Sequence, residues 1–178
     1  MKDNFDKALA EVLKHEGGFV NHPRDPGGMT NLGCTKKTWE RWVGRPVDEA
    51  EMRALTPADV GPLYKARYWD AIRGDELPSG VDYAMFDTAI NSGPVRAILL
   101  AQKIAGATQD GAIGPKTLAA IKAAVATYGI EAFIASYSEA REAFLRSLPT
   151  FDAFGRGWVR RVDEVEAVAS VLATSEVA

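Results

Sequence analysis

The pattern of hydrophobic and polar positions predicts a chain made mostly of amphipathic helices. In the first of them, Phe5, Leu9 and Val12 recur at helical spacing, and the same stripe continues onto Glu16. Two glycines follow Glu16 at once and suit a left-handed C-terminal cap. The sequence therefore predicts a first helix that ends at Glu16, with the carboxyl group on the apolar side of the helix.

One β-region and a series of further helices are expected after this first helix. The only strand candidate is the glycine-broken segment 19–34. N-cap, proline and glycine signals place the later helices. In chain order these are Thr35–Gly44, a helix from Thr56 toward Trp69, Val81–Ser92, Pro94–Ile104, Pro115–Tyr128, Ile130–Leu148 and about Asp152–Ala173. The expected fold is mainly α, a helical bundle with one small β-region.

The predicted position of Glu16 favours its protonated form. Burial against an apolar face and the negative end of a helix dipole both disfavour a charged carboxylate. A carboxyl group that holds its proton near neutral pH can act as a general acid. The alternative is a solvated glutamate in the last turn of an ordinary helix.

A glycine-rich bend after the first helix holds two further candidates, Asp25 and Thr30. Asp25 lies in R-D-P-G-G, a turn sequence in which an aspartate commonly bonds to its own backbone. Thr30 alone is typical of an ordinary β-hairpin residue. Taken together with Glu16, however, the two residues match a known pattern.

The spacing of this set resembles that of the tailed-phage lysozymes. Those enzymes carry a glutamate at the end of the first helix, an aspartate nine positions on, and then a threonine in a small β-region. Here the Glu16–Asp25 interval is also nine, whereas the Asp25–Thr30 interval of five is one residue shorter.

The wording E-G-G-F, followed by N-H-P-R-D-P-G-G-M-T-N-L-G, resembles more closely the muramidases of glycoside hydrolase family 108. This resemblance implies an α+β lysozyme-like fold and cleavage of the glycan strand of bacterial peptidoglycan. It implies Glu16 as the acid, with Asp25 and Thr30 as further catalytic residues.

A second informative segment, V-D-Y-A-M-F-D-T-A-I-N-S-G-P, is a helix that ends at a glycine and a proline. The family-like interpretation makes Phe86, Asp87, Asn91, Ser92 and Gly93 the opposite wall of a substrate cleft. Asn91 can instead be a helix-end preference. Asp87 can instead pair with a structural partner.

The second half of the chain carries two weaker signals. D-G-A-I-G-P-K-T-L resembles a turn of small peptidoglycan-binding helical modules, and F-G-R-G-W-V-R-R-V resembles the end of the domain that accompanies these muramidases. Trp158 is expected to pack, whereas Arg160 and Arg161 either hold wall carboxylates or lock the last helix. We expect a catalytic lobe at 1–93 and a peptidoglycan-binding lobe at 94–178, packed against each other.

Composition bounds the remaining function classes. Of 178 residues, 47% are hydrophobic and 25% charged, and the net charge of −3 comes without a basic cluster, so a nucleic-acid partner is not expected. No apolar run has the length of a membrane span, and the first residues lack the apolar core of a signal peptide. The single cysteine, Cys34, is expected to be a small buried residue; His15, His22 and Cys34 match no zinc pattern, so no metal or cofactor is expected.

These observations lead to one preferred function, with an alternative biological role and two alternative functions. We expect an N-acetylmuramidase that hydrolyses the β-1,4 bond between N-acetylmuramic acid and N-acetylglucosamine. As a phage or prophage endolysin it would be made in the cytoplasm without a signal peptide, act as a monomer, and reach the wall after release by a holin. A bacterial enzyme of wall remodelling or export stays open, and so do a lytic transglycosylase and a non-catalytic wall-binding or secretion-accessory protein.

Overall fold

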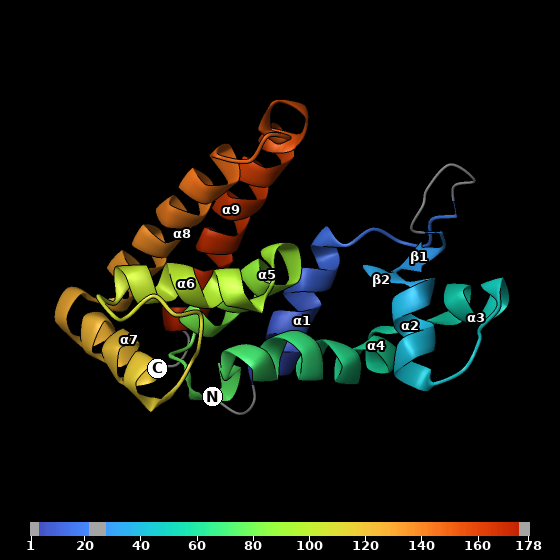
Figure 1. Cartoon of the computed structure of the whole chain (residues 1–178), viewed down its shortest axis with the longest axis horizontal. Coiled ribbons are helices and arrows are strands. Elements are labelled where there is room, and N and C mark those ends of the chain that lie inside the picture. Colours follow the sequence, from blue (N-terminus) through green and yellow to red (C-terminus); the bar gives the residue numbers. More distant parts are fainter. Residues whose placement is uncertain (1–3, 22–27, 175–178) are drawn as a thin grey trace. The chain divides into compact units, whose positions relative to one another are not determined.

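A computed structural model describes residues 4–21 and 28–174 and confirms the mainly helical fold (Figure 1). One short antiparallel hairpin follows the first helix in the described part of the chain. The elements, in order, are α1 (Asn4–His15), β1 (Thr30–Asn31), β2 (Cys34–Thr35), α2 (Lys36–Val43), α3 (Glu49–Ala54), α4 (Pro57–Tyr64), a π-helix η1 (Lys65–Trp69), two 3₁₀ turns η2 (Asp70–Ile72) and η3 (Gly74–Glu76), α5 (Val81–Ser92), α6 (Pro94–Ile104), α7 (Pro115–Tyr128), α8 (Ile130–Arg146) and α9 (Phe151–Thr174).

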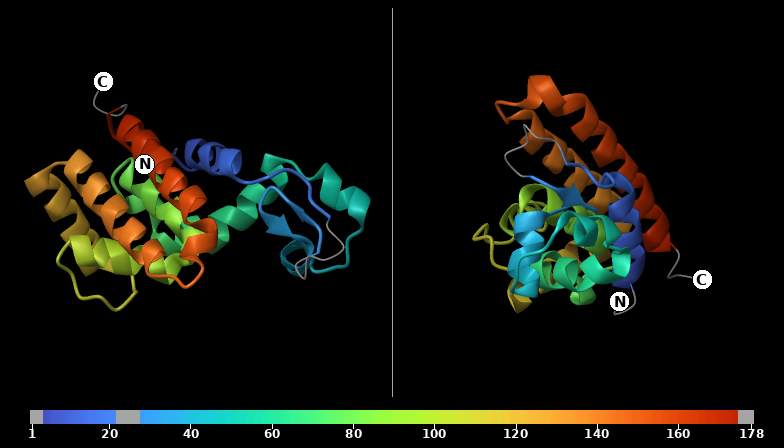
Figure 2. Two further views of the ribbon diagram at one scale, coloured as in Figure 1. Left: turned by 90° about the horizontal axis from the view of Figure 1, so that it is seen from above. Right: turned by 90° about the vertical axis from the view of Figure 1, so that its right-hand side faces the viewer.

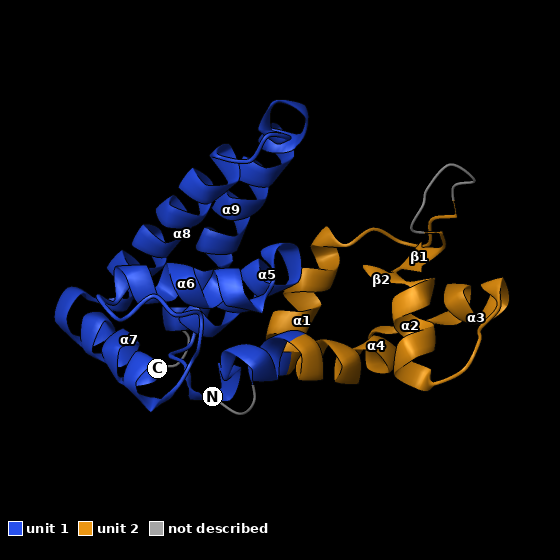
Figure 3. Ribbon diagram, viewed as in Figure 1, with its two compact units in different colours: residues 1–5, 68–178 blue, residues 6–67 orange. Residues whose placement is uncertain are grey.

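The chain divides into two compact units (Figure 3). Unit 2 holds residues 6–67, and unit 1 holds residues 1–5 together with 68–178. This division by contacts falls between η1 residues, whereas the domain boundary expected from the sequence lies after Gly93. The two are different kinds of boundary, and the sequence-based one stays a prediction.

Local capping explains where the helices of unit 2 begin and end. The Thr35 side chain accepts a hydrogen bond from the Thr38 amide at the start of α2, and Gly44 ends that helix in the left-handed region at φ 74°. Thr56 and Asp59 form a reciprocal capping box at the start of α4. The structure thus confirms the sequence-based predictions that Thr35 and Thr56 cap helices and that a helix ends at Gly44.

Unit 1 is built around α5, whose residues 81–89 are all buried. Helices α6, α8 and α9 pack against it, so α5 has no solvent face along most of its length. α8 and α9 lie side by side as a helical hairpin in both Figure 1 and Figure 2. An edge-to-face trio of Phe5, Trp69 and Phe86, with ring centroids 5.3–5.8 Å apart, fills the space beside α5.

The D-G-A-I-G turn between α6 and α7 is held by one buried side chain. The Gln102 amide nitrogen donates to Asp110 at 2.7 Å and to the Ala112 carbonyl at 3.0 Å, while its oxygen accepts from the Gly111 amide at 3.0 Å. Because these bonds satisfy a fully buried amide, the turn has a structural reason to carry this sequence.

Three elements differ from the sequence-based expectation. Within its described residues, 19–21 and 28–34, the β-region has a two-residue ladder and a bridge between Val20 and Thr30. Helix α3 was not expected, and the helix expected from Thr56 to Trp69 changes to a π-helix at Lys65.

Of the described helices, none alone is long and apolar enough to cross a membrane. Helices α7 and α8 reach that length and hydropathy only as a pair, and this pair is bent by 117°.

Candidate active site

Glu16 is the first residue after α1, and its side chain is half-buried. The segment that follows is tied to β1, because Val20 and Thr30 exchange both backbone hydrogen bonds at 2.8 and 2.9 Å. This pairing turns the chain back beside the end of α1. Glu16 is thereby fixed between a helix terminus and a hairpin.

The hairpin closes through a two-residue turn of strained geometry. The register Asn31↔Cys34 leaves Leu32 and Gly33 as the turn residues, and both have positive φ, at 48° and 71°. Two positive values are typical of a type I′ turn, which glycine adopts freely and leucine does not. The Tyr64 hydroxyl donates to the Leu32 carbonyl at 2.9 Å and so holds the unfavourable residue in place.

Gly33 lies directly against the Glu16 carboxyl group. A Cβ atom at Gly33 would lie 2.7 Å from Oε2 of Glu16 and 2.5 Å from the Tyr64 hydroxyl. The Glu16 and Tyr64 oxygens therefore both lie close to Gly33, and only a glycine at this position leaves room for them. The Tyr64 side chain itself is buried, so its hydroxyl is a fixed feature of this site.

Two residues of the hairpin, Asn31 and Cys34, are buried. Asn31 is buried and donates to the Met52 carbonyl at 2.8 Å, which attaches β1 to the end of α3. Cys34 is buried as expected, and this burial raises the pKa of its thiol to about 11, against an opposing effect of Arg67. Cys34 is thus a protonated core residue near neutral pH.

The other two predicted catalytic residues are placed unequally. Thr30 lies at the start of β1, half-buried, and its hydroxyl makes no hydrogen bond with the residues that the structure describes. Asp25, like His22, lies outside the described residues, so the structure does not place it relative to Glu16 and its role stays a prediction.

Phe86 and Asp87 have structural surroundings rather than a place on a substrate-binding wall. Both are fully buried in unit 1. Phe86 belongs to the aromatic trio, and Asp87 forms ion pairs with Arg141 at 2.7 Å and Arg161 at 2.8 Å. Burial alone would raise the pKa of Asp87, but the two guanidinium groups outweigh it and hold that pKa below its usual value. Of the alternatives open for Asp87, the structure favours the structural pair.

The remaining predicted contacts lie at the end of α5. Asn91 is exposed, and Ser92 donates to its side-chain oxygen at 3.1 Å. Gly93, at φ 88°, ends the helix with its amide bonded to the Ala89 carbonyl. These three residues are accessible to a ligand, and their assignment as substrate contacts stays a prediction.

The three residues singled out near the C-terminus have separate surroundings. Arg161 locks α9 onto α5 through Asp87. Arg160 is exposed and lies 3.7 Å from Glu164. Trp158 packs between Phe151 and Phe154, with centroids at 6.3 and 5.9 Å. Among the described residues, no group of three or more His, Cys, Asp or Glu side chains could hold a metal ion.

Sequence reasoning missed Gly33 and Tyr64 as parts of this site. Tyr64 was expected first as a core residue, and it is one, but its hydroxyl reaches a turn 32 residues earlier in the chain. No local pattern reveals that pairing. What the cluster can do chemically is offer one half-buried carboxyl group beside a narrow turn, a group of the kind that serves as a general acid or base.

A glutamate after the first helix, set over a small hairpin in a helical protein, defines the lysozyme-like glycosidases. Residues 9–93 match the family model described as Glycosyl hydrolase 108, and residues 96–163 match a model described as Predicted Peptidoglycan domain. A solved structure titled "Structure of Brucella abortus SagA" is similar to the chain, with 44% identity, 97% of each chain covered and a TM-score of 0.82. No curated protein matches the sequence.

The chain belongs to glycoside hydrolase family 108, and it combines that domain with a peptidoglycan-type domain. It is therefore a protein of the peptidoglycan hydrolase type. Glu16, Thr30, Gly33 and Tyr64 all fall in the first matched range.

Proposed function

We propose that the chain is an N-acetylmuramidase that hydrolyses the β-1,4 bond between N-acetylmuramic acid and N-acetylglucosamine in peptidoglycan. The observation that carries the proposal is the Glu16 carboxyl group, held against Gly33 and beside the Tyr64 hydroxyl within the range matched by family 108. A carboxyl group fixed in this way suits a general acid, because its proton can be aimed at one oxygen of a bound glycan.

In the proposed mechanism Glu16 protonates the departing glycosidic oxygen. Asp25 stabilises positive charge on the sugar ring or orients the attacking water. The Thr30 hydroxyl forms a hydrogen bond that holds this water in place. We propose an inverting reaction, since the resemblance to the tailed-phage lysozymes implies a water between the two carboxyl groups. The predicted result is a product whose new reducing end has the anomeric configuration opposite to that of the substrate.

Product analysis tests this function and separates it from its rivals. Purified sacculi are digested in ¹⁸O-labelled water, and the soluble fragments are identified by mass spectrometry. An N-acetylmuramidase gives reducing N-acetylmuramic acid ends that carry one labelled oxygen. Unlabelled 1,6-anhydro ends would replace the proposal with a lytic transglycosylase. Binding to sacculi without any soluble fragment would replace it with a non-catalytic wall-binding protein.

For the biological role, we propose a phage or prophage endolysin that is made in the cytoplasm, acts as a monomer and reaches the wall after release by a holin. A second candidate is a bacterial enzyme of wall remodelling or export, and the similarity to a Brucella abortus protein favours it. Induced expression in a bacterial host, with and without a co-expressed holin, distinguishes the two. Lysis that depends on the holin supports the endolysin, whereas growth without lysis in both cultures supports the bacterial role.

A further inference from the structure

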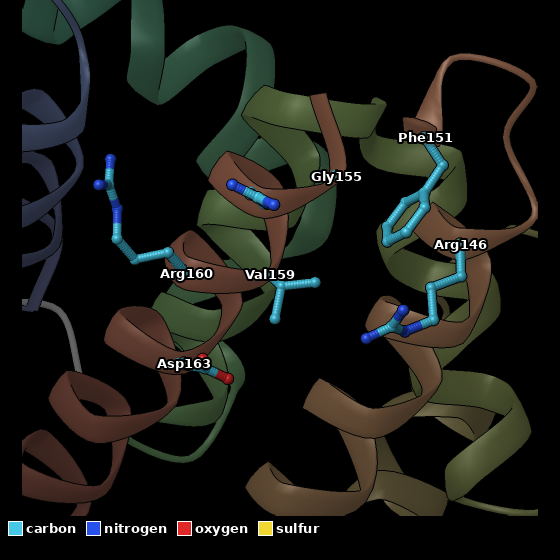
Figure 4. A pocket seen from close by; sticks show the side chains of 7 residues that line it. Arg146, Phe151, Gly155, Val159, Arg160 and Asp163 are labelled. Carbon is cyan, nitrogen blue, oxygen red and sulfur yellow. The ribbon is translucent and has the colours of Figure 1, made fainter. Parts of the chain in front are cut away.

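A pocket of about 400 Å³ lies where α8 ends and α9 begins, within unit 1 (Figure 4). It is separate in sequence from the residues around Glu16. Its lining combines three cations, one anion and an apolar surface, namely Arg146, Arg156, Arg160, Asp163, Phe151, Val159 and Gly155. All seven residues fall inside the range matched by the peptidoglycan-domain model, 96–163.

The apolar wall of the pocket is held in a defined position. Any Cβ at Gly155 would lie 2.7–2.8 Å from the ring of Phe151, so only a glycine at this position leaves room for the ring. The guanidinium of Arg146 lies over the same ring, 5.0 Å from its centroid, and is tied to Glu142 at 2.6 Å. Arg146 is thus already part of an ion pair.

Two opposite charges on this pocket have no partner among the residues that the structure describes. Arg156 and Asp163 are exposed, and neither makes a hydrogen bond or ion pair with a residue of the described part of the chain. Positions 156, 159, 160 and 163 follow the helical period and so share one face of α9. In Figure 4 the Asp163 carboxylate points toward the side on which Arg146 and Phe151 lie, with Val159 between them.

The charge arrangement favours a ligand that carries both signs. Arg146 is neutralised by Glu142, and Arg160 lies 3.7 Å from Glu164, so the pocket does not offer three unpaired cations to a polyanion. Beside an apolar surface it offers one cation and one anion, Arg156 and Asp163, that have no partner among the described residues. An anion alone would leave Asp163 facing it, which costs affinity.

We propose that this pocket binds the zwitterionic end of a peptidoglycan stem peptide. The ligand class is a diamino acid residue with a free side-chain amine and carboxylate. Its carboxylate pairs with Arg156, its ammonium group pairs with Asp163, and its methylene chain covers Phe151 and Val159. The inference rests on peptidoglycan being the substrate, and it gives the second domain a contact with the peptide rather than with the glycan.

The test is a titration of the full chain with a soluble stem tetrapeptide that contains meso-diaminopimelate and an acetylated N-terminus, followed by NMR chemical shifts. We expect Arg156→Gln to weaken binding about threefold to tenfold, the scale of an exposed charged contact. Lys116→Gln makes the same charge change at an exposed site on α7 and should leave the affinity unchanged. Equal affinities for the parent and Arg156→Gln would overturn the proposal.

The next test combines acetylation of the peptide's side-chain amine with the Asp163→Asn substitution, as in a double-mutant cycle. Acetylation should weaken binding to the parent severalfold but have no effect on binding to Asp163→Asn, because the pair is already missing there. Titration with inorganic phosphate covers the rival source of negative charge. Phosphate that competes with the peptide and binds Asp163→Asn more tightly than the parent would make this a simple anion site and overturn the proposal. Failure here, with labelled reducing ends still released from sacculi, leaves the proposed hydrolase intact.

Discussion

Glu16 in unit 2 and Asp87 in unit 1 are both acidic residues on or beside a helix, and their surroundings differ in every respect. Glu16 is half-buried, next to a glycine that makes room for it and a tyrosine hydroxyl. Asp87 is fully buried between two guanidinium groups that hold it ionised. The first arrangement leaves a carboxyl group that a substrate can contact. In the second, the carboxylate is engaged by two arginines and links three helices. Acidity in the sequence alone does not tell these roles apart.

The largest effect is expected when the unit 1 pair is broken. Asp87→Asn leaves Arg141 buried without a counter-charge, and loss of one partner of a buried ion pair costs about 3–5 kcal/mol. Urea unfolding should show this loss, while Glu139→Gln, at an exposed site on α8, should stay within about 0.5 kcal/mol of the parent. Full stability of Asp87→Asn would mean that the comparison between the two acids is wrong.

A second acid of α5 gives a pH test of opposite sign. Burial raises the pKa of Asp82 to about 6, although Asn4 and the amides of Tyr83 and Gly80 donate hydrogen bonds to it. The folded state therefore binds this proton more tightly than the unfolded state, so the stabilisation is complete below about pH 4 and is lost as pH rises through about 6.

The expected size of this pH effect is up to about 3 kcal/mol, at 1.36 kcal/mol per pKa unit. It is measured as the difference in unfolding free energy between the parent and Asp82→Asn, whose side-chain oxygen can still accept the two amide bonds. Asp87 acts in the opposite direction, because its lowered pKa gives stability that is lost as pH falls. Parallel pH curves for the parent and Asp82→Asn would exclude this assignment.

Gly33→Ala tests whether the glycine makes room for Glu16. The left-handed backbone should cost about 1–2 kcal/mol, and the clash with the Glu16 carboxyl should lower hydrolysis about tenfold, a loss expected of a misplaced catalytic group. Gly44→Ala is the matched control, because Gly44 has nearly the same φ, 74°, with nothing near its Cβ position. It should lose similar stability and keep its specific activity. Equal activities of the two variants would show that Gly33 serves the turn alone.

The smallest effect is expected from removal of one hydroxyl. Tyr64→Phe deletes the hydrogen bond to the Leu32 carbonyl, which is worth about 1 kcal/mol, and should lower activity severalfold by loosening the turn. Tyr137→Phe deletes the equivalent bond to the Ala97 carbonyl, at 3.2 Å, in unit 1. That variant should lose stability without a change in activity. A comparable loss of activity in both variants would argue against a positioning role for Tyr64.

Local signals were sufficient for much of the fold. Thr35, Gly44 and the Thr56 capping box act within a few residues of themselves, so their sequence pattern determines where helices begin and end. The short helix α3 carries such a signal too, because the Asp48 side chain accepts a hydrogen bond from the Glu51 amide at its start, but this helix was not predicted. The change to a π-helix at Lys65 was not predicted either. The exact extent of the β-region likewise depended on one bridge between Val20 and Thr30.

The position of Glu16 at the end of the first helix could be predicted from the sequence, whereas its neighbours Gly33 and Tyr64 could not. The apolar stripe of α1 and the glycines after it identified the position of Glu16. Tyr64 and Gly33 join Glu16 only through folding, across 48 and 17 residues of chain, and no periodicity encodes that contact. The ion pairs of Asp87 could not be predicted for the same reason, because its partners Arg141 and Arg161 lie far along the sequence.

The measurement that tests the role of Glu16 most directly is the rate at which Glu16→Gln releases reducing ends from purified sacculi. Glu11→Gln, five residues earlier and within α1, is the isosteric control, and Glu11 is paired with Lys14 at 2.6 Å. We predict a loss of roughly a hundredfold or more for Glu16→Gln, the usual scale for a general acid, with an unchanged melting temperature and a near-parent rate for Glu11→Gln. A folded Glu16→Gln variant that releases reducing ends at the parent rate would contradict the assignment.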